Sequence, residues 1–445
     1  MKSSRRTFLK KTAAAGSATI VVPTILSSSV FGANDRINAA VLGVNGRGKA
    51  HIQGFMAQDN VRIKTLCDPD MNILKDRQKE FKETYNKKVG LEQDMRRVFE
   101  DKDIDVVGIA TPNHWHALSV IWACQAGKDV YVEKPGSHNI TEGRKMVEAA
   151  EKYDRIVQHG VQLRSSPAIN EAIKLLRDGY IGRVYMARGL VFRWRGDIGD
   201  QGTSAVPEGL DYDLWTGPAP KRPFTKNLVH YNWHWHWDYG NGDVGNQGIH
   251  ETDLCMWGLD VGLPSEITSM GGKFLWDDCK EVPEVLTSIY KYPDEGKIIQ
   301  FEVRPWCTNT EDGVTVGNIF YGEKGILVVD GYDSYKTYMG QKRTPGQSGK
   351  DGENSGSEYD RGAGGTDGHF ANFIEAVRKH DKSILNGPVE TAHLSSGLAH
   401  LGNIAYRLGK VLKFDPKTEK FVNDKEADKM LTREYREGFE VPDKV

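Results

Sequence analysis

The sequence predicts an α/β protein that begins with a doubly wound parallel sheet and continues with an α+β domain containing a large, open, mainly antiparallel sheet. Between residues 37 and 157, short apolar runs alternate with helical patterns, which is typical of a parallel sheet covered by helices on both faces. After Ser166, strand-like runs and long loops replace this alternation. With 445 residues, the chain can form two sizeable cores. The formal net charge of -2 gives no electrostatic reason to expect nucleic acid as a partner.

The first 33 residues differ from the rest of the chain. Basic residues surround the run Ser4–Lys10 (SRRTFLK), and an apolar stretch diluted by Ser, Thr and Gly follows up to about Val30. This pattern predicts a signal peptide, and the paired arginines indicate export of the folded protein to the periplasm by the twin-arginine route. A disordered basic tail and an uncleaved anchor are the alternatives. No second apolar run of membrane-spanning length follows, so no integral span is expected after signal removal.

Short, apolar and often β-branched runs in the first domain are expected to be buried strands, namely residues 37–43, 61–67, 104–110 and 129–132. A helix is expected over residues 116–126, with Gly127 ending it. Another is expected over residues 142–153, with Thr141 as its N-cap. These helices connect strands that run in the same direction.

The second domain is expected to begin with a helix over residues 167–177 that ends at Gly179. The strands and helices expected after it are strands at residues 184–194, 297–306 and 325–329, and amphipathic helices at residues 368–379 and 391–410. Residues 344–368 are rich in Gly, Ser and Asp and are expected to form a mobile loop.

A glycine-rich loop ends the first predicted strand and begins the first predicted helix. Gly43 permits a sharp turn, Gly48 lets the helix pack close to the strand, and the helix N-terminus offers N–H groups to a pyrophosphate. The middle glycine of the G-x-G-x-x-G pattern is Asn45, with Gly46 beside it, and Asn tolerates a left-handed backbone. Asp68 ends the second strand, where an acid accepts ribose hydroxyls and favours NAD over NADP. The alternative is an ordinary glycine-rich turn without a ligand.

Three further motifs follow in order: Thr111–His116 (TPNHWH), Glu133–Pro135 (EKP) and Asp243–Asp253 (DVGNQGIHETD). With the Asn45 loop, they resemble the Gfo/Idh/MocA oxidoreductases, the glucose–fructose oxidoreductase and inositol dehydrogenase type, over roughly residues 34–410. Six of the ten tryptophans lie in residues 194–257. The N-terminal motif and this Trp-rich segment resemble an exported branch found in bacteria that degrade polysaccharides. We therefore divide the chain into a signal peptide (1–33), an NAD-binding Rossmann domain (34–157), a substrate and oligomerisation domain (158–410) and a tail (411–445).

The resemblance implies NAD as cofactor and a set of residues that bind it. These residues are Gly43, Asn45, Gly46, Arg47, Gly48, Asp68, Thr111, Pro112, Asn113, His116, Glu133 and Lys134. The resemblance also places Lys134 beside the nicotinamide, where it helps to handle the substrate hydroxyl proton, and makes Pro135 usually cis. A lysine at the carboxyl end of a parallel strand lies at the crevice where such sheets bind ligands, and a desolvated ammonium can exchange protons. A surface lysine at a strand end is the alternative.

The second signature of the family is an aspartate followed four residues later by a histidine. His250 matches the histidine, but Asn246 occupies the aspartate position. On a helix this spacing puts both side chains on one face, where an Asp would orient the imidazole and stabilise its cation while an Asn can only orient it. We expect His250 to be the general base, so that Lys134, His250 and Asn246 form the catalytic set. A structural histidine is the alternative.

The run Trp233–Asp238 (WHWHWD) is the most unusual string in the sequence. If it is extended, the tryptophans share one face, while His234, His236 and Asp238 share the other. Tryptophan faces can stack against sugar rings. A zinc or manganese site and a purely structural tryptophan core are the alternatives, and no metal is expected.

The resemblance also places Gln162, Arg164 and Arg193 where such families line the substrate cleft, with solvated surface groups as the alternative. The full set of expected substrate residues is Gln162, Arg164, Arg193, Trp233, His234, Trp235 and His236.

Three functions remain open at this stage. The first is hydride transfer between NAD(H) and a sugar or sugar-derived alcohol. The second is an NAD-dependent glycosidase that oxidises a ring hydroxyl, eliminates the aglycone and restores the sugar by reduction. The third is a sugar-binding protein without turnover, against which Lys134 and His250 argue. Because free NAD is scarce outside the cytoplasm, we expect a tightly bound cofactor that is recycled within each turnover. The resemblance implies a homodimer or homotetramer, formed through the open face of the second sheet.

Overall fold

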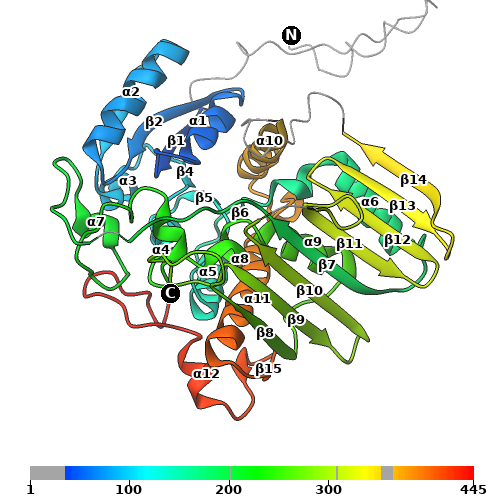
Figure 1. Cartoon of the computed structure of the whole chain (residues 1–445). Coiled ribbons are helices and arrows are strands. Elements are labelled where there is room, and N and C mark those ends of the chain that lie inside the picture. Colours follow the sequence, from blue (N-terminus) through cyan, green and yellow to red (C-terminus); the bar gives the residue numbers. More distant parts are fainter. Residues whose placement is uncertain (1–35, 201, 307–308, 352–363) are drawn as a thin grey trace, which may run out of the picture. The chain divides into compact units, whose positions relative to one another are not determined.

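The computed structural model describes residues 36–445, with gaps at residue 201, residues 307–308 and residues 352–363. The predicted signal peptide, residues 1–33, lies outside the described residues. Residues 37–445 form one structural unit, and Figure 1 shows its elements along the chain. Among the described residues, no helix is long and apolar enough to cross a bilayer.

The first sheet consists of six parallel strands in the order β3-β2-β1-β4-β5-β6. Its strands are β1 (Ile37–Leu42), β2 (Val61–Cys67), β3 (Gly90–Glu92), β4 (Val106–Ile109), β5 (Asp129–Val132) and β6 (Val157–His159). The strand order reverses next to β1, which is the arrangement of a doubly wound sheet. The expected strands at residues 61–67 and 129–132 match β2 and β5, and β1 and β4 are shorter than expected.

Helices cover both faces of this sheet. They are α1 (Gly48–Met56), α2 (Met71–Tyr85), α3 (Met95–Glu100), α4 (Asn113–Gln125), α5 (Ile140–Lys152) and, from far along the chain, α10 (Gly364–Lys379). One core joins the sheet to α3, α4 and α5, and the other joins it to α1, α2 and α10. Phe370 and Phe373 of α10 pack against Phe55 of α1, and Figure 1 shows the two helices close together. The nucleotide-binding half therefore needs a helix that follows most of the second domain in sequence.

Two helix starts differ from the expectation. Helix α4 begins at Asn113 instead of residue 116, because Pro112 fixes an extended backbone just before the first turn. Helix α5 begins at Ile140 and is capped by Asn139, whose side chain accepts a hydrogen bond from the Glu142 N–H, so the prediction of Thr141 as the N-cap was wrong.

The second sheet has ten strands in the order β14-β13-β12-β11-β7-β10-β9-β8-β15-β16. The strands are β7 (Val184–Phe192), β8 (Glu266–Gly272), β9 (Val285–Tyr292), β10 (Lys297–Arg304), β11 (Val316–Gly322), β12 (Gly325–Asp330), β13 (Ser334–Met339), β14 (Thr344–Lys350), β15 (Leu412–Asp415) and β16 (Lys420–Phe421). All neighbouring pairs are antiparallel except β7 and β10. The two sheets together confirm the predicted fold class.

Helices α6 (Pro167–Arg177), α9 (Ile249–Leu259) and α11 (Val389–Leu408) pack against the second sheet through one shared core. Helix α6 matches the expected range, and the Ser166 side chain caps it. Three short helices, α7 (Tyr212–Thr216), α8 (Gly242–Asn246) and α12 (Lys425–Lys429), lie in the connections.

The segments expected to be irregular contribute more structure than the sequence suggested. Residues 344–350 form β14, so the expected mobile loop is wrong for that part, and residues 352–363 lie outside the described residues. The segment expected to be a charged tail carries β15, which pairs with β8. Its last residues, including Phe439 and Val441, are buried in the core under α4. Their few apolar side chains gave no periodic signal among the charged neighbours.

Candidate active site

A cleft of about 670 Å³ lies at the carboxyl ends of the first-sheet strands. Gly43 follows β1, Asp68 follows β2, Thr111 follows β4 and Glu133 follows β5, and all four line the cleft. Ligands of doubly wound sheets bind at this edge, on either side of the point where the strand order reverses. Residues from the second domain, among them Arg193 and His250, form the opposite wall.

The glycine-rich loop has the close backbone contacts that a nucleotide loop requires. Gly43 has a φ of 79°, and a Cβ there would lie 2.6 Å from the carbonyl oxygen of Ala110. A Cβ on Gly48 would overlap the Gly43 carbonyl, so only glycine lets α1 start so near β1. Asn45 does not have a left-handed backbone conformation. The prediction that Asn replaces the glycine there because it tolerates that conformation was therefore wrong. Nothing would lie within 4 Å of a Cβ on Gly46, which leaves open space beside the loop.

Asp68 is buried and holds the loop through its carboxylate. Its Oδ2 accepts a hydrogen bond from the Val44 N–H at 2.9 Å, and its Oδ1 accepts one from the Asp70 N–H at 3.1 Å. Burial raises the pKa of Asp68, partly offset by these hydrogen bonds. The side chain faces the cleft, where carboxylate oxygens can also accept ribose hydroxyls.

Glu133 connects the loop to the strand that carries Lys134. Its Oε1 lies 2.7 Å from Arg47 Nε, 3.2 Å from His51 Nε2 and 3.4 Å from Gln162 Nε2. Burial alone would raise the pKa of Glu133, but Arg47, His51 and Lys134 outweigh it and hold the pKa well below its usual range. Glu133 is therefore an anion that positions Arg47 at the cleft.

The TPNHWH motif is joined to the EKP motif by a buried histidine. One ring nitrogen of His116 lies 2.6 Å from the carbonyl oxygen of Pro135, and the other lies 2.8 Å from that of Thr111. The Lys134–Pro135 peptide bond is cis, as the resemblance implied. Pro112 and Asn113 also line the cleft at the start of α4. These contacts fix the backbone from which Lys134 projects.

Lys134 and His250 both line this cleft, with Asn246 beside them. The Lys134 ammonium donates a hydrogen bond to the backbone carbonyl of Asn246. Burial, and then the Lys134 charge, lower the pKa of His250 well below its usual value, so the imidazole is neutral near pH 7. Among the described residues, no group hydrogen-bonds to His250 Nδ1. A neutral imidazole beside an ammonium can accept a proton from a bound hydroxyl.

The predicted helical pairing of Asn246 with His250 was wrong. Helix α8 ends at Asn246 and α9 begins at Ile249, so the two residues lie on different helices separated by a turn. The Asn246 amide points toward Asp243 Oδ1 at 3.5 Å instead. Asn246 thus acts on Lys134 through its backbone, a role for which the identity of its side chain is secondary.

Four of the seven expected substrate residues line the cleft: Gln162, Arg193, Trp233 and His234. The other three lie elsewhere. Arg164 forms a two-point ion pair with Asp253, at 2.8 and 2.9 Å, and stacks over Trp257. Trp235 is buried, and His236 Nδ1 lies 3.5 Å from Glu281.

The WHWHWD string is not extended. Asn232–Trp235 form a 3₁₀ helix, in which the alternation of faces assumed for a strand does not hold. His234 contacts the Tyr231 carbonyl, and Asp238 pairs with Arg222 at 2.5 Å. Within the described part of the chain, no group of three His, Cys, Asp or Glu side chains is placed to hold a metal ion.

Several residues of the second-domain wall were not predicted from the sequence. Arg195 lines the cleft and forms a two-point ion pair with Asp243, at 2.9 and 3.0 Å, and its Nη1 lies 3.3 Å from Tyr231 Oη. Tyr332 also lines the cleft, with its ring 5.4 Å from that of His250. The spacing of Arg195 from Arg193 could have revealed it, since alternate residues of an extended segment share a face. Tyr332 lies in a turn between β12 and β13 and carries no local signal.

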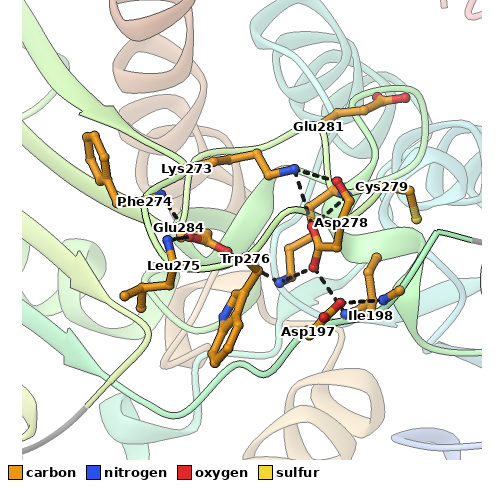
Figure 2. A network of polar contacts seen from close by, with 12 residues as sticks. Asp197, Ile198, Lys273, Phe274, Leu275, Trp276, Asp278, Cys279, Glu281 and Glu284 are labelled. Carbon is orange, nitrogen blue, oxygen red and sulfur yellow. Dashed lines mark hydrogen bonds and ion pairs between the residues drawn. The ribbon is translucent and has the colours of Figure 1, made fainter.

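A buried charge network outside the cleft supports this wall (Figure 2). Asp278 has a fully buried side chain, lies 2.6 Å from Lys280 Nζ and accepts a hydrogen bond from the Ile198 N–H at 3.0 Å. Glu284 accepts hydrogen bonds from the backbone N–H groups of Phe274 and Leu275. The connection between β8 and β9 is thereby fastened to residues 195–199, which begin with the cleft residue Arg195.

The fold and the site define a dinucleotide-binding protein whose cleft holds a lysine and a neutral histidine. The chain belongs to the Gfo/Idh/MocA oxidoreductase family. The family model for the NAD-binding Rossmann fold matches residues 37–161, and the model for the C-terminal alpha/beta domain matches residues 182–300 and 364–441. NAD is therefore the cofactor class of the first domain.

Two curated relatives show sequence similarity to parts of the chain. Levoglucosan dehydrogenase of Pseudarthrobacter phenanthrenivorans is 30% identical over 165 residues, 36% of this chain and 42% of that protein. A glycosyl hydrolase family 109 protein of Shewanella pealeana is 34% identical over 175 residues, 34% of this chain and 38% of that protein. The chain thus spans less than half the length of these relatives.

A solved structure extends the similarity of fold to most of the chain. Levoglucosan dehydrogenase in complex with NADH and levoglucosan superposes with a TM-score of 0.64 at 18% identity, covering 85% of this chain and 99% of that one. At this identity, the superposition establishes the fold alone.

Proposed function

We propose that this protein is an NAD-dependent oxidoreductase acting on a CH–OH group of a sugar or sugar-derived substrate. The observation that carries the proposal is that Lys134 and neutral His250 line the same cleft as the nucleotide loop. Because a Cβ at Gly43 or Gly48 would clash with the backbone, and Asp68 faces the cleft, the residues present fit a dinucleotide. The levoglucosan dehydrogenase relative supports a carbohydrate substrate.

The glycine-rich loop and Asp68 would hold NAD, which when bound would supply a hydride acceptor for oxidation of a carbinol carbon. In the same step, His250 takes the hydroxyl proton, and the Lys134 ammonium stabilises the negative charge that develops on the oxygen. The Asn246 carbonyl holds the ammonium in place. In the reverse direction, protonated His250 returns the proton to the substrate oxygen.

The test is absorbance in the reduced-nicotinamide band when the NAD-loaded protein meets a panel of sugars and glycosides. We expect a rise with wild type and a loss of at least 100-fold in rate with Lys134→Met or His250→Asn, since each removes a group that acts in proton transfer. Lys174→Met, an exposed change on α6, is the matched control. Equal rates in wild type and both active-site variants would overturn the proposal.

The second candidate is a glycosidase that uses NAD transiently, and the similarity to the Shewanella pealeana protein favours it. Oxidation of a ring hydroxyl would acidify the adjacent C–H bond, elimination would release the aglycone, and reduction would restore the sugar. Product analysis in the same assay separates the candidates. A free aglycone without net NADH indicates a glycosidase, and an accumulating ketone or lactone indicates a dehydrogenase. A protein that binds sugars without either product would be a binding protein.

We also propose that the twin-arginine route exports the folded protein to the periplasm with its cofactor bound. The run Ser4–Lys10 supports the route. Contacts between the Rossmann domain and the second-domain segment over the cleft support retention. Asp70 Oδ2 lies 3.1 Å from His230 Nε2, and the Met71 N–H donates to the Gly209 carbonyl at 2.9 Å. Nucleotide-free protein after native purification from the periplasm would contradict this proposal.

We propose, finally, that copies of the chain associate through the sheet face opposite α9 and α11. Half-buried charged side chains lie along it, with Arg188 3.2 Å from Glu302 and Arg304 Nε 2.9 Å from Glu302. Such a face suits a symmetric dimer, in which each surface patch meets its own copy.

A further inference from the structure

A buried polar cluster lies behind His250, and neither the nucleotide loop nor the lysine–histidine pair uses it. Its members are Gln247 at the turn between α8 and α9, Glu251 in the first turn of α9, and Tyr332 between β12 and β13. Gln247 and Glu251 are almost completely buried, whereas Tyr332 lines the cleft. The cluster therefore connects the interior of the second domain with the surface that a substrate touches.

The hydrogen bonds in this cluster have a definite direction. The Gln247 amide donates to Tyr332 Oη, and Tyr332 Oη lies 3.4 Å from Glu251 Oε1, to which it can donate its own proton. Gln247 Nε2 also lies 3.4 Å from Glu251 Oε1. On its other side, Gln247 Oε1 accepts a hydrogen bond from Arg193 at 2.9 Å. Two cleft residues, Tyr332 and Arg193, are thus held from behind by one glutamine.

Glu251 is fixed in position by its backbone as well. Its carbonyl accepts a hydrogen bond from the Asn318 amide of β11 at 2.8 Å, and its Cβ lies close to Gly189 of β7. Among the described residues, Glu251 Oε2 has no hydrogen-bond partner. An ionised carboxylate with an unpartnered buried oxygen is costly, and burial raises the pKa of Glu251 to about 8. A neutral acid in this place can orient its neighbours without placing a charge beside His250.

We propose that Glu251 is a positioning residue that orients Tyr332 and Gln247, so that Tyr332 Oη and Arg193 bind a hydroxyl adjacent to the carbon that reacts at His250. The inference rests on the proposed carbohydrate function and narrows it, because the substrate class becomes a vicinal diol. Recognition of the second hydroxyl fixes which carbon faces the cofactor. A site built to hydrogen-bond a hydroxyl discriminates against an analogue that lacks it, since its own polar groups are then left unpaired.

The test compares the sugar of the panel that reacts fastest with its monodeoxy analogues, using wild type, Tyr332→Phe and the matched control Tyr338→Phe. Tyr338 lies on β13 outside the cleft. We expect Tyr332→Phe to lower kcat/KM for the parent sugar about 10-fold, mainly through KM, and to have no effect for one deoxy analogue. An equal effect of Tyr332→Phe on the parent and every analogue would overturn the inference.

Glu251→Gln and Glu251→Ala test the positioning role. We expect Glu251→Gln, which keeps a neutral side chain of the same shape, to retain most of the activity, and Glu251→Ala to reproduce the KM increase of Tyr332→Phe. If Glu251→Ala does not fold, infrared difference spectra of wild type and Glu251→Gln decide instead. A carboxylic-acid band that is present in wild type and lost in Glu251→Gln supports a neutral Glu251 that positions its neighbours. Absence of this band from wild type overturns that role.

Failure of this inference and failure of the proposed function give different results. If wild type oxidises sugars while Tyr332→Phe and Glu251→Ala behave like wild type, the inference fails and the function stands. If wild type shows no turnover, calorimetric titration with the same sugars replaces the kinetic readout. If the sugars then bind more weakly to Tyr332→Phe than to wild type, the inference is supported although the proposed function is not. If they bind equally to both, or do not bind to wild type, the inference is overturned.

Discussion

At the scale of single residues, the chemistry depends on charges that are held at short range. The Lys134 ammonium and the burial of His250 act in the same direction on the imidazole, and both keep it unprotonated. Glu133 is an anion, and its ion pair with Arg47 holds that cation in place. The cleft can therefore contain the cations of Lys134 and Arg47 while His250 stays neutral and able to accept a proton.

One prediction follows from the proximity of Lys134 to His250. Lys134→Met removes a positive charge that lowers the pKa of His250, so the pKa should rise toward its ordinary value of 6.5. The imidazole would then be protonated, and lost as a base, at a higher pH than in wild type. NMR titration of ring-labelled histidine measures this without activity, with Lys174→Met as the control. An unchanged or lower pKa in Lys134→Met would show that the two groups do not interact.

Residues with local signals could be predicted from the sequence, and residues with distant partners could not. The loop around Gly43, the acid at Asp68 and the lysine at the end of β5 follow from strand–turn–helix patterns. The resemblance placed Arg164 in the cleft, and nothing near it in sequence reveals its ion-pair partner Asp253 on α9. Tyr332 was missed because the cluster behind it joins residues about 80 positions apart.

At the scale of elements, the β8–β9 connection shows how a loop can be made rigid at the cost of burying charges. Asp278 and Lys280 are nearly completely buried and form an ion pair at 2.6 Å, and the Asp278 carboxylate also accepts backbone N–H groups and lies 3.3 Å from Lys273 Nζ. The buried pair fixes the position of the cleft wall, because this loop holds residues 195–199 in place. Trp276 of the loop donates a hydrogen bond to the Arg195 carbonyl. Apolar periodicity cannot reveal such an element, and no structure was predicted for these residues.

We predict that Asp278→Leu lowers the free energy of unfolding by about 3–5 kcal/mol, because Lys280 then loses its main buried partner. The double variant Asp278→Leu/Lys280→Met should recover most of this loss, and Asp197→Asn at the surface should change little. Urea denaturation measures all three. A double variant as unstable as the single one would show that the pair does not act as a unit.

The pH dependence of this stabilisation has a definite sign. Burial raises the pKa of Asp278, but Lys280 and the Ile198 N–H outweigh it and leave the pKa below the ordinary 3.8. The stabilisation is therefore fully present above the ordinary pKa and is lost as the pH falls through the lower folded value. Stability of wild type should fall more steeply than that of the double variant only in this acidic range.

At the scale of the whole molecule, contacts between the two domains make them interdependent. Arg433, in the C-terminal segment, donates hydrogen bonds to the carbonyls of Asp238 and His114, one from each domain. The parallel first sheet and the position of the cleft at the carboxyl ends of its strands follow from local alternation and could be predicted. The second-sheet edge at β15 and the C-terminal packing could not, because short apolar runs among charged residues carry no periodic pattern.

We predict that Arg188→Glu shifts the protein toward the monomer in solution, because it places a third acidic side chain beside Glu302 and Glu311 on the proposed association face. Light scattering across a concentration series measures the mass. Arg183→Glu, at the exposed position just before the same strand begins, is the control. A wild type that is monomeric at all concentrations would contradict association through this face.

The position of α10 determines when the protein can become functional during its synthesis. Phe370 and Phe373 complete the core beneath β1 and α1, yet they follow the nucleotide loop by more than three hundred residues. A ribosome that has translated residues 37–161 has therefore produced a sheet in which α1 and α2 cover one face without α10. The core that supports the nucleotide loop is therefore completed only after most of the second domain has been translated, and we expect tight binding of NAD to require α10.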